Sequence, residues 1–508
     1  MTRPRLEPLM AALTSLIACG CAAVGPNFRP PSAPATSRYV SPADTAEAAA
    51  SAEVTGSAGL RQSVVLGERV TAQWWTLFRS PQLDGVVRQA IAGSPTLDAA
   101  KARLAQAREA VAETRATLFP QVGLSATDAE EKQSAAAFGL SPQTFPLPSR
   151  YNIFQVGPTA SYNLDLFGGV RRQVEERSAQ ADEQADQLDA AYMALTGNAV
   201  TQAIRIAAFR AQLAAVDEIL AADRQNAALV GEERRVGEAP DPDVVIARSQ
   251  VAADETLRPG LAQQLSIARH TLAVLVGQPP GDWSPPDFDL ATLTLPGQVP
   301  VSLPSELVHQ RPDILAAEAR LHAASAQIGV AAAQLYPSIT LTAGADASSL
   351  NGGALFSQNG LVWSIAAGVA QPVFDAGRRR AERRAALAAF RATAADYRQT
   401  VLEAFGQVAN LLQALGHDAD LVAGQRRSWE LAASSVRLQR INYGRGGIGM
   451  LPVLDAERQY ARARLGYLQA QAQRYQDTAE LLVAMGGGWW GADLTRADNT
   501  TSSTGRRP

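Results

Sequence analysis

The sequence predicts a mostly helical fold that also contributes β-strands to a barrel shared between copies of the chain. Three observations predict it: an internal tandem repeat, a switch from helical to alternating apolar spacing within each repeat, and helical stretches too long for one globular domain. The chain has 508 residues, a length that by itself would suggest about three domains. The repeat replaces that expectation with two copies of one unit.

The repeat is visible by direct alignment. SPTLDAAKARLAQAREAVAETRATLFPQVGLSA, from Ser94, aligns with RPDILAAEARLHAASAQIGVAAAQLYPSITLTA, from Arg311. Further along, the glycine Gly237 of the first copy aligns with Gly446 of the second. The two copies span residues 95–280 and 312–486, with an inter-repeat linker at 281–311.

Each copy shows the same order of spacings. A helix begins at a proline, because proline is tolerated in the first turn, and apolar residues then recur three and four positions apart. The spacing next changes to two, which predicts a β-hairpin, and a very long proline-free helix and a final helix follow. The predicted ranges for the two copies are hairpins at about 121–167 and 338–373, long helices at about 170–230 and 376–443, and final helices at about 241–276 and 450–484.

The predicted strands have the length and pattern of membrane strands. From Phe154 to Leu166 every second residue is apolar, and strands of about ten residues cross an outer membrane when tilted. A half-buried soluble sheet would alternate too, but the chain offers no second sheet for these strands to pack against. Four strands cannot close a barrel, which needs about eight. Three chains would supply twelve, so we predict a trimer that shares one barrel.

The N-terminus has the pattern of a secretory signal. Arg3 and Arg5 precede an apolar run, and small residues lead into Cys19. The residues before Cys19 resemble a bacterial lipobox, so we predict lipidation of Cys19, with Cys21 as the alternative. An ordinary cleaved signal would leave two free thiols in an oxidising compartment. The predicted segments are a signal peptide at 1–18, a lipidated N-terminus and extended linker at 19–70, an N-terminal helical segment at 71–94 and a C-terminal tail at 487–508.

The composition and motifs predict a protein that is not an enzyme. The glycines of YGRGGIG, from Tyr443, match a dinucleotide-binding spacing, but they follow a very long helix rather than a strand. We interpret Gly237 and Gly446 as helix-turn glycines with positive φ. The four histidines lie outside any zinc or hydrolase motif, and both cysteines precede residue 22. We therefore expect no metal and no cofactor beyond the covalent N-terminal lipid. The net charge of -3 gives no attraction to nucleic acid.

Four stretches together resemble one known family. They are AVGPNFRPP after the cysteines, WWTLFRSPQLDGVVRQAIAGSPTLDAAKARLAQA, RPDILAAEARLHAASAQIGVAAAQLYPSITL and YGRGGIGMLPVLDAERQYARARLGYL. The chain is similar to outer membrane efflux proteins, the TolC-like outer membrane factors, in their lipoprotein branch. The resemblance implies a trimer whose 12-stranded outer-membrane β-barrel continues into a 12-helix periplasmic α-barrel.

The resemblance also implies function, partners and location. It implies the exit duct of a tripartite efflux pump in the outer membrane of a Gram-negative bacterium, conducting drugs, toxic small molecules or metal ions and so contributing to multidrug resistance. The implied partners are a periplasmic adaptor (membrane fusion) protein and an inner-membrane resistance-nodulation-division transporter. Two alternatives stay open: the exit channel of a protein secretion system, and a non-conducting structural periplasmic lipoprotein.

Three residues match positions of the family's periplasmic gate: Asp243, Tyr443 and Asp455. A ring of three Asp455 carboxylates would favour cations at the constriction. The sequence departs from the family at Pro452, where an aspartate is frequent, and at Ile448, where some members have an arginine. An alternative role for the two aspartates is to bind free amide groups at helix N-termini.

Overall fold

The computed structural model describes residues 23–36, 38–40, 62–132, 150–357 and 360–487. Cys19, Cys21 and the predicted signal peptide lie outside the described residues. The chain divides into two compact units. Unit 1 comprises residues 1–31, 104–184 and 317–397, and unit 2 comprises residues 32–103, 185–316 and 398–508.

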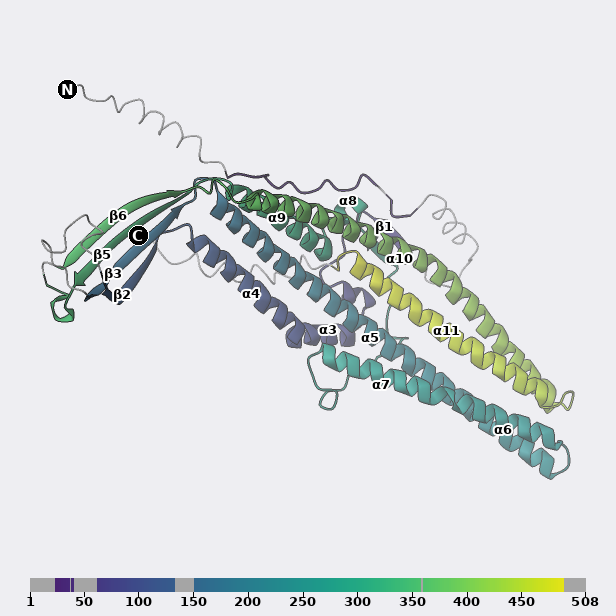
Figure 1. Ribbon diagram of the computed structural model, residues 1–508. Helices are drawn as coiled ribbons and strands as arrows, with labels where there is room; N and C mark the ends of the chain where they lie inside the picture. Colours follow the sequence, from purple (N-terminus) through teal and green to yellow (C-terminus); the bar gives the residue numbers. More distant parts are fainter. Residues whose placement is uncertain (1–22, 37, 41–61, 133–149, 358–359, 488–508) are drawn as a thin grey trace, which may run out of the picture. The chain divides into compact units, whose positions relative to one another are not determined.

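The described elements follow the order of the repeat (Figure 1). Before and within the first copy they are β1 (Ser63–Leu66), η1 (Trp74–Phe78), α3 (Pro81–Gly93), α4 (Pro95–Ala116), β2 (Gln121–Glu131), β3 (Tyr151–Leu164), α5 (Gly169–Arg235), α6 (Asp241–Glu255) and α7 (Leu257–Leu275). After it they are β4 (Gln298–Val301), α8 (Pro304–Leu307), α9 (Pro312–Ala333), β5 (Ser338–Ser349), η3 (Gly352–Ala354), β6 (Leu361–Ala370), α10 (Arg378–Gly444) and α11 (Leu451–Ala484). The fold class is confirmed: two hairpins, two very long helices and shorter helices in a tandem repeat.

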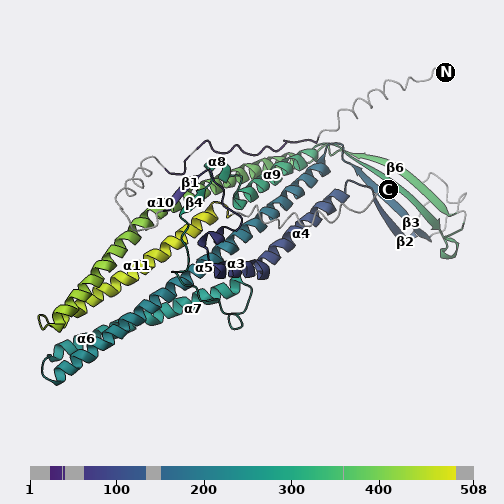
Figure 2. The ribbon, with the colours of Figure 1, turned by 180° about the vertical axis from the view of Figure 1, so that it is seen from behind.

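The four long strands form one antiparallel sheet in unit 1, in the order β2-β3-β5-β6, and lie side by side in both views (Figure 1, Figure 2). Pairing of β3 with β5 joins the two repeats, with Tyr162 opposite Leu341. Residues opposite each other in a sheet share a face. The register therefore gathers the apolar half of every strand on one face: Val122, Leu124, Ala126, Val156, Pro158, Ala160, Tyr162, Leu164, Ile339, Leu341, Ala343, Ala345, Trp363, Ile365, Ala367 and Val369.

This apolar face is open in the single chain. Leu124 and Ile365, on the two outer strands, are each 78% exposed, and Trp363 is 70% exposed. Water-soluble sheets cover such a face, whereas a lipid-facing sheet leaves it bare. The outer edges of β2 and β6 have no partner strand among the described residues. The sheet thus needs both a lipid environment and neighbouring strands.

The long helices α5 and α10 each have 67 residues, about 100 Å at 1.5 Å per residue. Both begin with an aspartate that binds free amide groups of the first turn. Asp165 accepts hydrogen bonds from the amides of Val170 and Arg171, and Asp375 accepts them from Gly377 and Arg379. The long helices of the two copies therefore begin with the same kind of aspartate cap.

The final helix of the first copy differs from the prediction. Instead of one helix over about 241–276, the structure has α6 and α7, separated at Thr256. Pro259 lies in the first turn of α7, where its missing amide and fixed φ suit a helix start but would interrupt a continuous helix. The prediction of one continuous helix over about 241–276 is therefore wrong.

Short elements also occur in the stretches predicted as linkers. β1 pairs in parallel with β4, Ser63 opposite Gln298 through Leu66 opposite Val301, and α8 follows β4. The strands have only four residues each and lie far apart in the sequence, so no local spacing indicates them. Within unit 2, the pair joins the residues before η1 to those that connect the two repeats.

The core of unit 2 contains buried aromatic residues and the buried, ion-paired Arg311. Trp74, Trp75 and Phe78 are at most 1% exposed, and the Trp75 indole donates to Asp84 at 2.9 Å. Arg311 is 6% exposed and ion-paired with Asp313, and its Nη1 donates to Gln407 of α10 and to the last carbonyl of α11. Among the described residues, no helix combines the length and the apolar character that a membrane span requires.

Candidate functional site

Both long helices end in the same turn motif in unit 2. Gly237 has φ of +85° and Gly446 has φ of +73°, the left-handed region that glycine enters without strain. The amide of each glycine donates to the carbonyl three residues back, and the next amide donates to the carbonyl five residues back. This pair of bonds is the Schellman motif, which satisfies the free carbonyls of a helix end.

Replacing Gly446 by alanine is expected to weaken its turn by about 1 kcal/mol, because a Cβ strains the left-handed conformation. Nothing lies within 4 Å of the added Cβ, so the effect is a backbone effect alone. Gly231→Ala is the matched control: this glycine is inside α5 with equally free space, and the change should stabilise the helix by about 1 kcal/mol. Amide hydrogen exchange around Gly446 and around Gly231 measures the two changes in stability. Equal exchange in the two variants would contradict the interpretation of Gly446 as a turn glycine.

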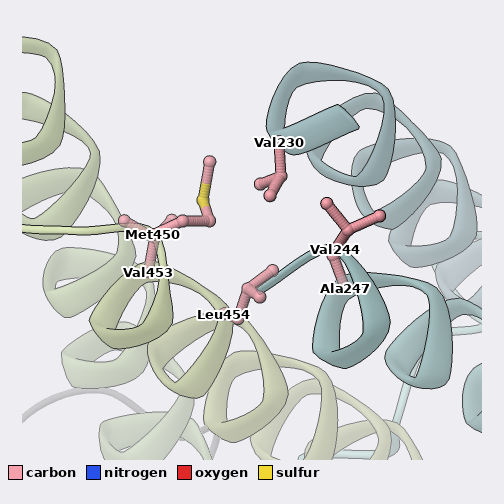
Figure 3. Close-up of a cluster of buried hydrophobic side chains, with 6 residues drawn as sticks. All are labelled: Val230, Val244, Ala247, Met450, Val453 and Leu454. Atoms are coloured by element: carbon pink, nitrogen blue, oxygen red, sulfur yellow. The ribbon is translucent and has the colours of Figure 1, made fainter. Parts of the chain in front are cut away.

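A buried apolar cluster joins the two turns. Figure 3 shows side chains from the end of α5 and the start of α6 facing side chains from the start of α11. Its members, all at most 6% exposed, are Val230, Val244, Ala247, Met450, Val453 and Leu454. Tyr443 and Ile448 pack against the cluster while partly exposed. Apolar contact therefore holds the ends of the two helix pairs together.

A polar link lies beside this cluster. The Tyr443 hydroxyl donates a hydrogen bond to the Glu233 carboxylate and so connects the last turns of α10 and α5. Burial raises the pKa of Glu233, and the nearby charges of Glu238 and Asp243 raise it further. Because the neighbouring groups Glu238 and Asp243 are acidic, the Glu233 carboxylate lies among like charges. The hydrogen bond from the Tyr443 hydroxyl stabilises it there.

A second polar link joins three helices. Glu457 of α11 is 7% exposed and accepts hydrogen bonds from Arg440 of α10, at 2.9 Å from Nε and 2.6 Å from Nη2. The other carboxylate oxygen accepts from the side-chain amide of Asn226 on α5. Because a buried carboxylate is costly without partners, these three groups stabilise one arrangement of the helices.

A pair of carboxyl groups lies next to this link. Asp223 of α5 is 3% exposed, and burial, the adjacent Asp254 carboxyl of α6 and the charge of Glu457 raise its pKa to about 7. Gln250 donates to Asp254 at 2.7 Å. Two carboxyls this close do not both ionise easily, so the pair holds a proton over part of the physiological pH range.

Water can reach these groups from one side. Asp223, Arg440 and Glu457 all line a crevice between α5, α10 and α11 that also contains Glu218, Arg437 and Tyr460. The mixture of basic and acidic side chains gives the crevice no single sign of charge. Proton exchange with solvent is therefore possible at the Asp223–Asp254 pair.

The three gate residues predicted from the sequence have different surroundings in the structure. Tyr443 forms the link to Glu233, and Asp243, in the first turn of α6, contributes to the field around that carboxylate. Asp455 contacts its own helix, through Arg458 at 3.2 Å and Gln459 at 3.0 Å, and its side chain is 57% exposed. Asp455 is not in the first turn of α11, so the helix N-terminal role is wrong for this residue and remains open for Asp243.

Sequence reasoning missed Glu233, Arg440 and Glu457. For Glu233 a signal existed in the repeat, since Glu233 precedes Gly237 by almost the same number of residues as Tyr443 precedes Gly446. Two equivalent turns that meet bring such positions together. No comparable signal marks the other two residues. In the described part of the chain, no group of three or more His, Cys, Asp or Glu residues is arranged to hold a metal ion.

Comparisons with known proteins agree on one family. A model described as "Outer membrane efflux protein" matches residues 86–278 and 303–487. The chain is 31% identical over 424 residues to the "Pyoverdine export outer membrane protein OpmQ" of Pseudomonas aeruginosa, covering 82% of this chain and 87% of that protein. It is 26% identical to the "Probable outer membrane lipoprotein SilC" of Salmonella typhimurium, covering 95% and 98%.

The structural comparison gives the same result. The solved structure described as the outer-membrane channel OprN superposes with a TM-score of 0.81 at 27% identity, covering 92% of this chain and all of that chain.

Proposed function

The chain belongs to the outer membrane efflux protein family, and we propose that it forms the trimeric exit duct of a tripartite efflux pump. In this proposal it conducts small toxic molecules, drugs or metal ions passively from the periplasm to the exterior. It receives them from a periplasmic adaptor and an inner-membrane transporter of the resistance-nodulation-division type. It catalyses no reaction and binds no cofactor apart from its covalent lipid.

The observation that carries the proposal is the four-stranded sheet. Its apolar face is most exposed on the two outer strands, β2 and β6, whose outer edges need partner strands. Open edges in lipid leave backbone groups without hydrogen bonds, which only closure of a barrel avoids. Three copies supply the number of strands that a closed barrel of suitable width requires.

We further propose that the joined turns in unit 2 close the duct at rest. The apolar cluster and the Tyr443–Glu233 and Arg440–Glu457–Asn226 links all connect the first helix pair, α5–α6, with the second, α10–α11. Separating the pairs requires that these contacts break together. A gate held by several weak contacts can open when a partner protein supplies comparable binding energy.

The lipid anchor is part of the same proposal. We propose that Cys19, or alternatively Cys21, carries the lipid, and the name of the relative SilC as an outer membrane lipoprotein supports this. A lipid chain adds membrane affinity of about 0.8 kcal/mol for each buried methylene.

Planar-bilayer recording of the purified protein tests the duct. Heat-modifiable trimers that conduct ions in discrete steps are expected, and a protein that stays monomeric or never conducts would instead be a structural lipoprotein. Cross-linking in cells followed by mass spectrometry identifies the transporter it binds. A resistance-nodulation-division pump with its adaptor supports efflux, whereas a protein exporter would assign the channel to secretion.

A further inference from the structure

The segment that follows the two cysteines, Ala23 to Phe28, is held in unit 1 by one buried arginine. Arg172 of α5 has a side chain only 5% exposed. Its Nε donates to the carbonyl of Val24 at 3.1 Å, and its Nη2 donates to the carbonyl of Gly25 at 3.3 Å and to Asn27 at 2.8 Å. One guanidinium thus satisfies acceptors on three residues of an irregular segment.

Close backbone contact holds the same segment from the other side. Gly25 has φ of +99°, and a Cβ built on it would lie 2.5 Å from the Cα of Gly329 in α9. A Cβ on Gly329 would in turn lie 2.7 Å from the Arg172 side chain, and one on Gly168 would lie 2.4 Å from Ala23. Glycine at these positions is therefore required for the segment to approach both helices.

Phe28 completes the attachment. Its ring stacks on His322 of α9, with centroids 4.4 Å apart and planes 12° apart. The His322 Nε2 is 3.0 Å from Glu175, whose other carboxylate oxygen accepts from Arg172 at 2.6 Å. The segment, α5 and α9 are thereby connected through one network, which we call the N-terminal seat: Arg172, Glu175, His322, Gly25 and Gly329.

The seat lies at the junction of strand and helix. The amide of Val24 donates to the carbonyl of Phe167 at 3.0 Å, and Phe167 lies between the end of β3 and the start of α5. Ala23 follows Cys21 by two residues and Cys19 by four. An extended chain spans at most about 3.6 Å per residue, so a tether of two to four residues keeps an attached lipid close to Ala23.

We propose that Arg172 is the positioning residue of the lipid anchor: by holding residues 23–28 at the strand–helix junction, it fixes where the lipid chains enter the membrane relative to the barrel. The proposal rests on the lipidation proposed above. A lipid on a flexible tether keeps the protein at the membrane but does not orient it. A lipid held at the junction places the strand ends at the bilayer surface, which raises their effective concentration for insertion.

Arg172→Ala is expected to release the segment without removing the lipid. Chymotrypsin should then cleave after Phe28 at least about tenfold faster, because cleavage follows the population of the detached segment. Pulse-chase labelling should show heat-modifiable trimers in the outer membrane appearing about fivefold more slowly, as the effective concentration falls. Mass spectrometry of the N-terminal peptide should find the lipid still on Cys19 or Cys21. Arg177→Ala is the matched control and should behave as the parent chain, because Arg177 is an exposed arginine on the same helix whose Nη1 donates to Gln180 of that helix at 2.9 Å.

A double-mutant cycle separates positioning from a structural role. A parent with both cysteines replaced by serine and a signal cleaved by the ordinary peptidase has no anchor to position. In that background Arg172→Ala should not slow trimer formation further. An equal slowing with and without the lipid would overturn the proposal and make Arg172 a structural residue. An unlipidated N-terminus in the natural chain would overturn the anchor itself, whereas conductance of the trimers tests the duct independently.

Discussion

The double variant Glu457→Gln with Tyr443→Phe is expected to leave the channel open at rest. The change removes the charge that pairs with Arg440 and the hydroxyl that binds Glu233, and it keeps the size of both side chains. Breaking a buried ion pair costs about 3–5 kcal/mol, but Arg440 is 49% exposed, so about 1 kcal/mol is the appropriate scale here. The tyrosine hydrogen bond contributes about 1 kcal/mol more.

Together these losses shift the equilibrium between closed and open states by about 30-fold. Single-channel recording measures the shift as a higher open probability, and cells should take up a large antibiotic that the closed channel excludes. Glu403→Gln is the matched control for the change of charge. Glu403 lies on α10, as Tyr443 does, but its exposed side chain accepts a hydrogen bond from Gln399 of the same helix. The gate assignment fails if the double variant records like the parent channel, or if the control opens to the same degree.

Raising the pH through about 7 is expected to loosen the contact between the two helix pairs. Burial first, then the Asp254 carboxyl and the charge of Glu457, raise the pKa of Asp223 from 3.8 to about 7. Packing against α11 adds the charge of Glu457, so Asp223 binds a proton more readily in the packed state than in the separated state, in which Asp254 stays beside it. The free energy of separation therefore falls as the pH rises through about 7, and the stabilisation is lost above that value.

Asp223→Asn is expected to remove most of this pH dependence, because the amide stays neutral. Hydrogen exchange of the amides around Val230 and Leu454, compared at pH 5 and pH 8 after correction for the intrinsic rate, reports the local effect. A local measurement is needed because burial also raises the pKa of Asp189, and of Asp418 beside Asp477, elsewhere in unit 2. Asp217 lies on α5, as Asp223 does, and forms an exposed ion pair with Arg258 of α7, so Asp217→Asn should keep the parent's pH dependence. The same pH dependence in both variants would exclude the Asp223–Asp254 pair as its source.

Local spacing was sufficient to predict most of the fold. Apolar residues at every second position predicted the strands, and the register placed most of them, such as Leu124, Pro158 and Ala345, on one face. The glycines of the two turns were also visible, because a helix end that needs positive φ restricts the residue type. The division of the final helix at Thr256 was missed although Pro259 indicated it, since the apolar spacing continues across the break.

The sequence by itself determined the repeat, the order of helices and strands, and the family, because these depend on spacing between residues close together in the chain. Only the tertiary structure decided which side chains meet. Glu233 and Tyr443, Asn226 and Glu457, and Ala23 and Gly168 are separated by up to 231 positions, and no local pattern selects one partner among many similar residues. The candidate gate and the N-terminal seat both consist of such distant contacts. Their energies come from burial and from pairing between charges, which exist only once the helices of both repeats have packed.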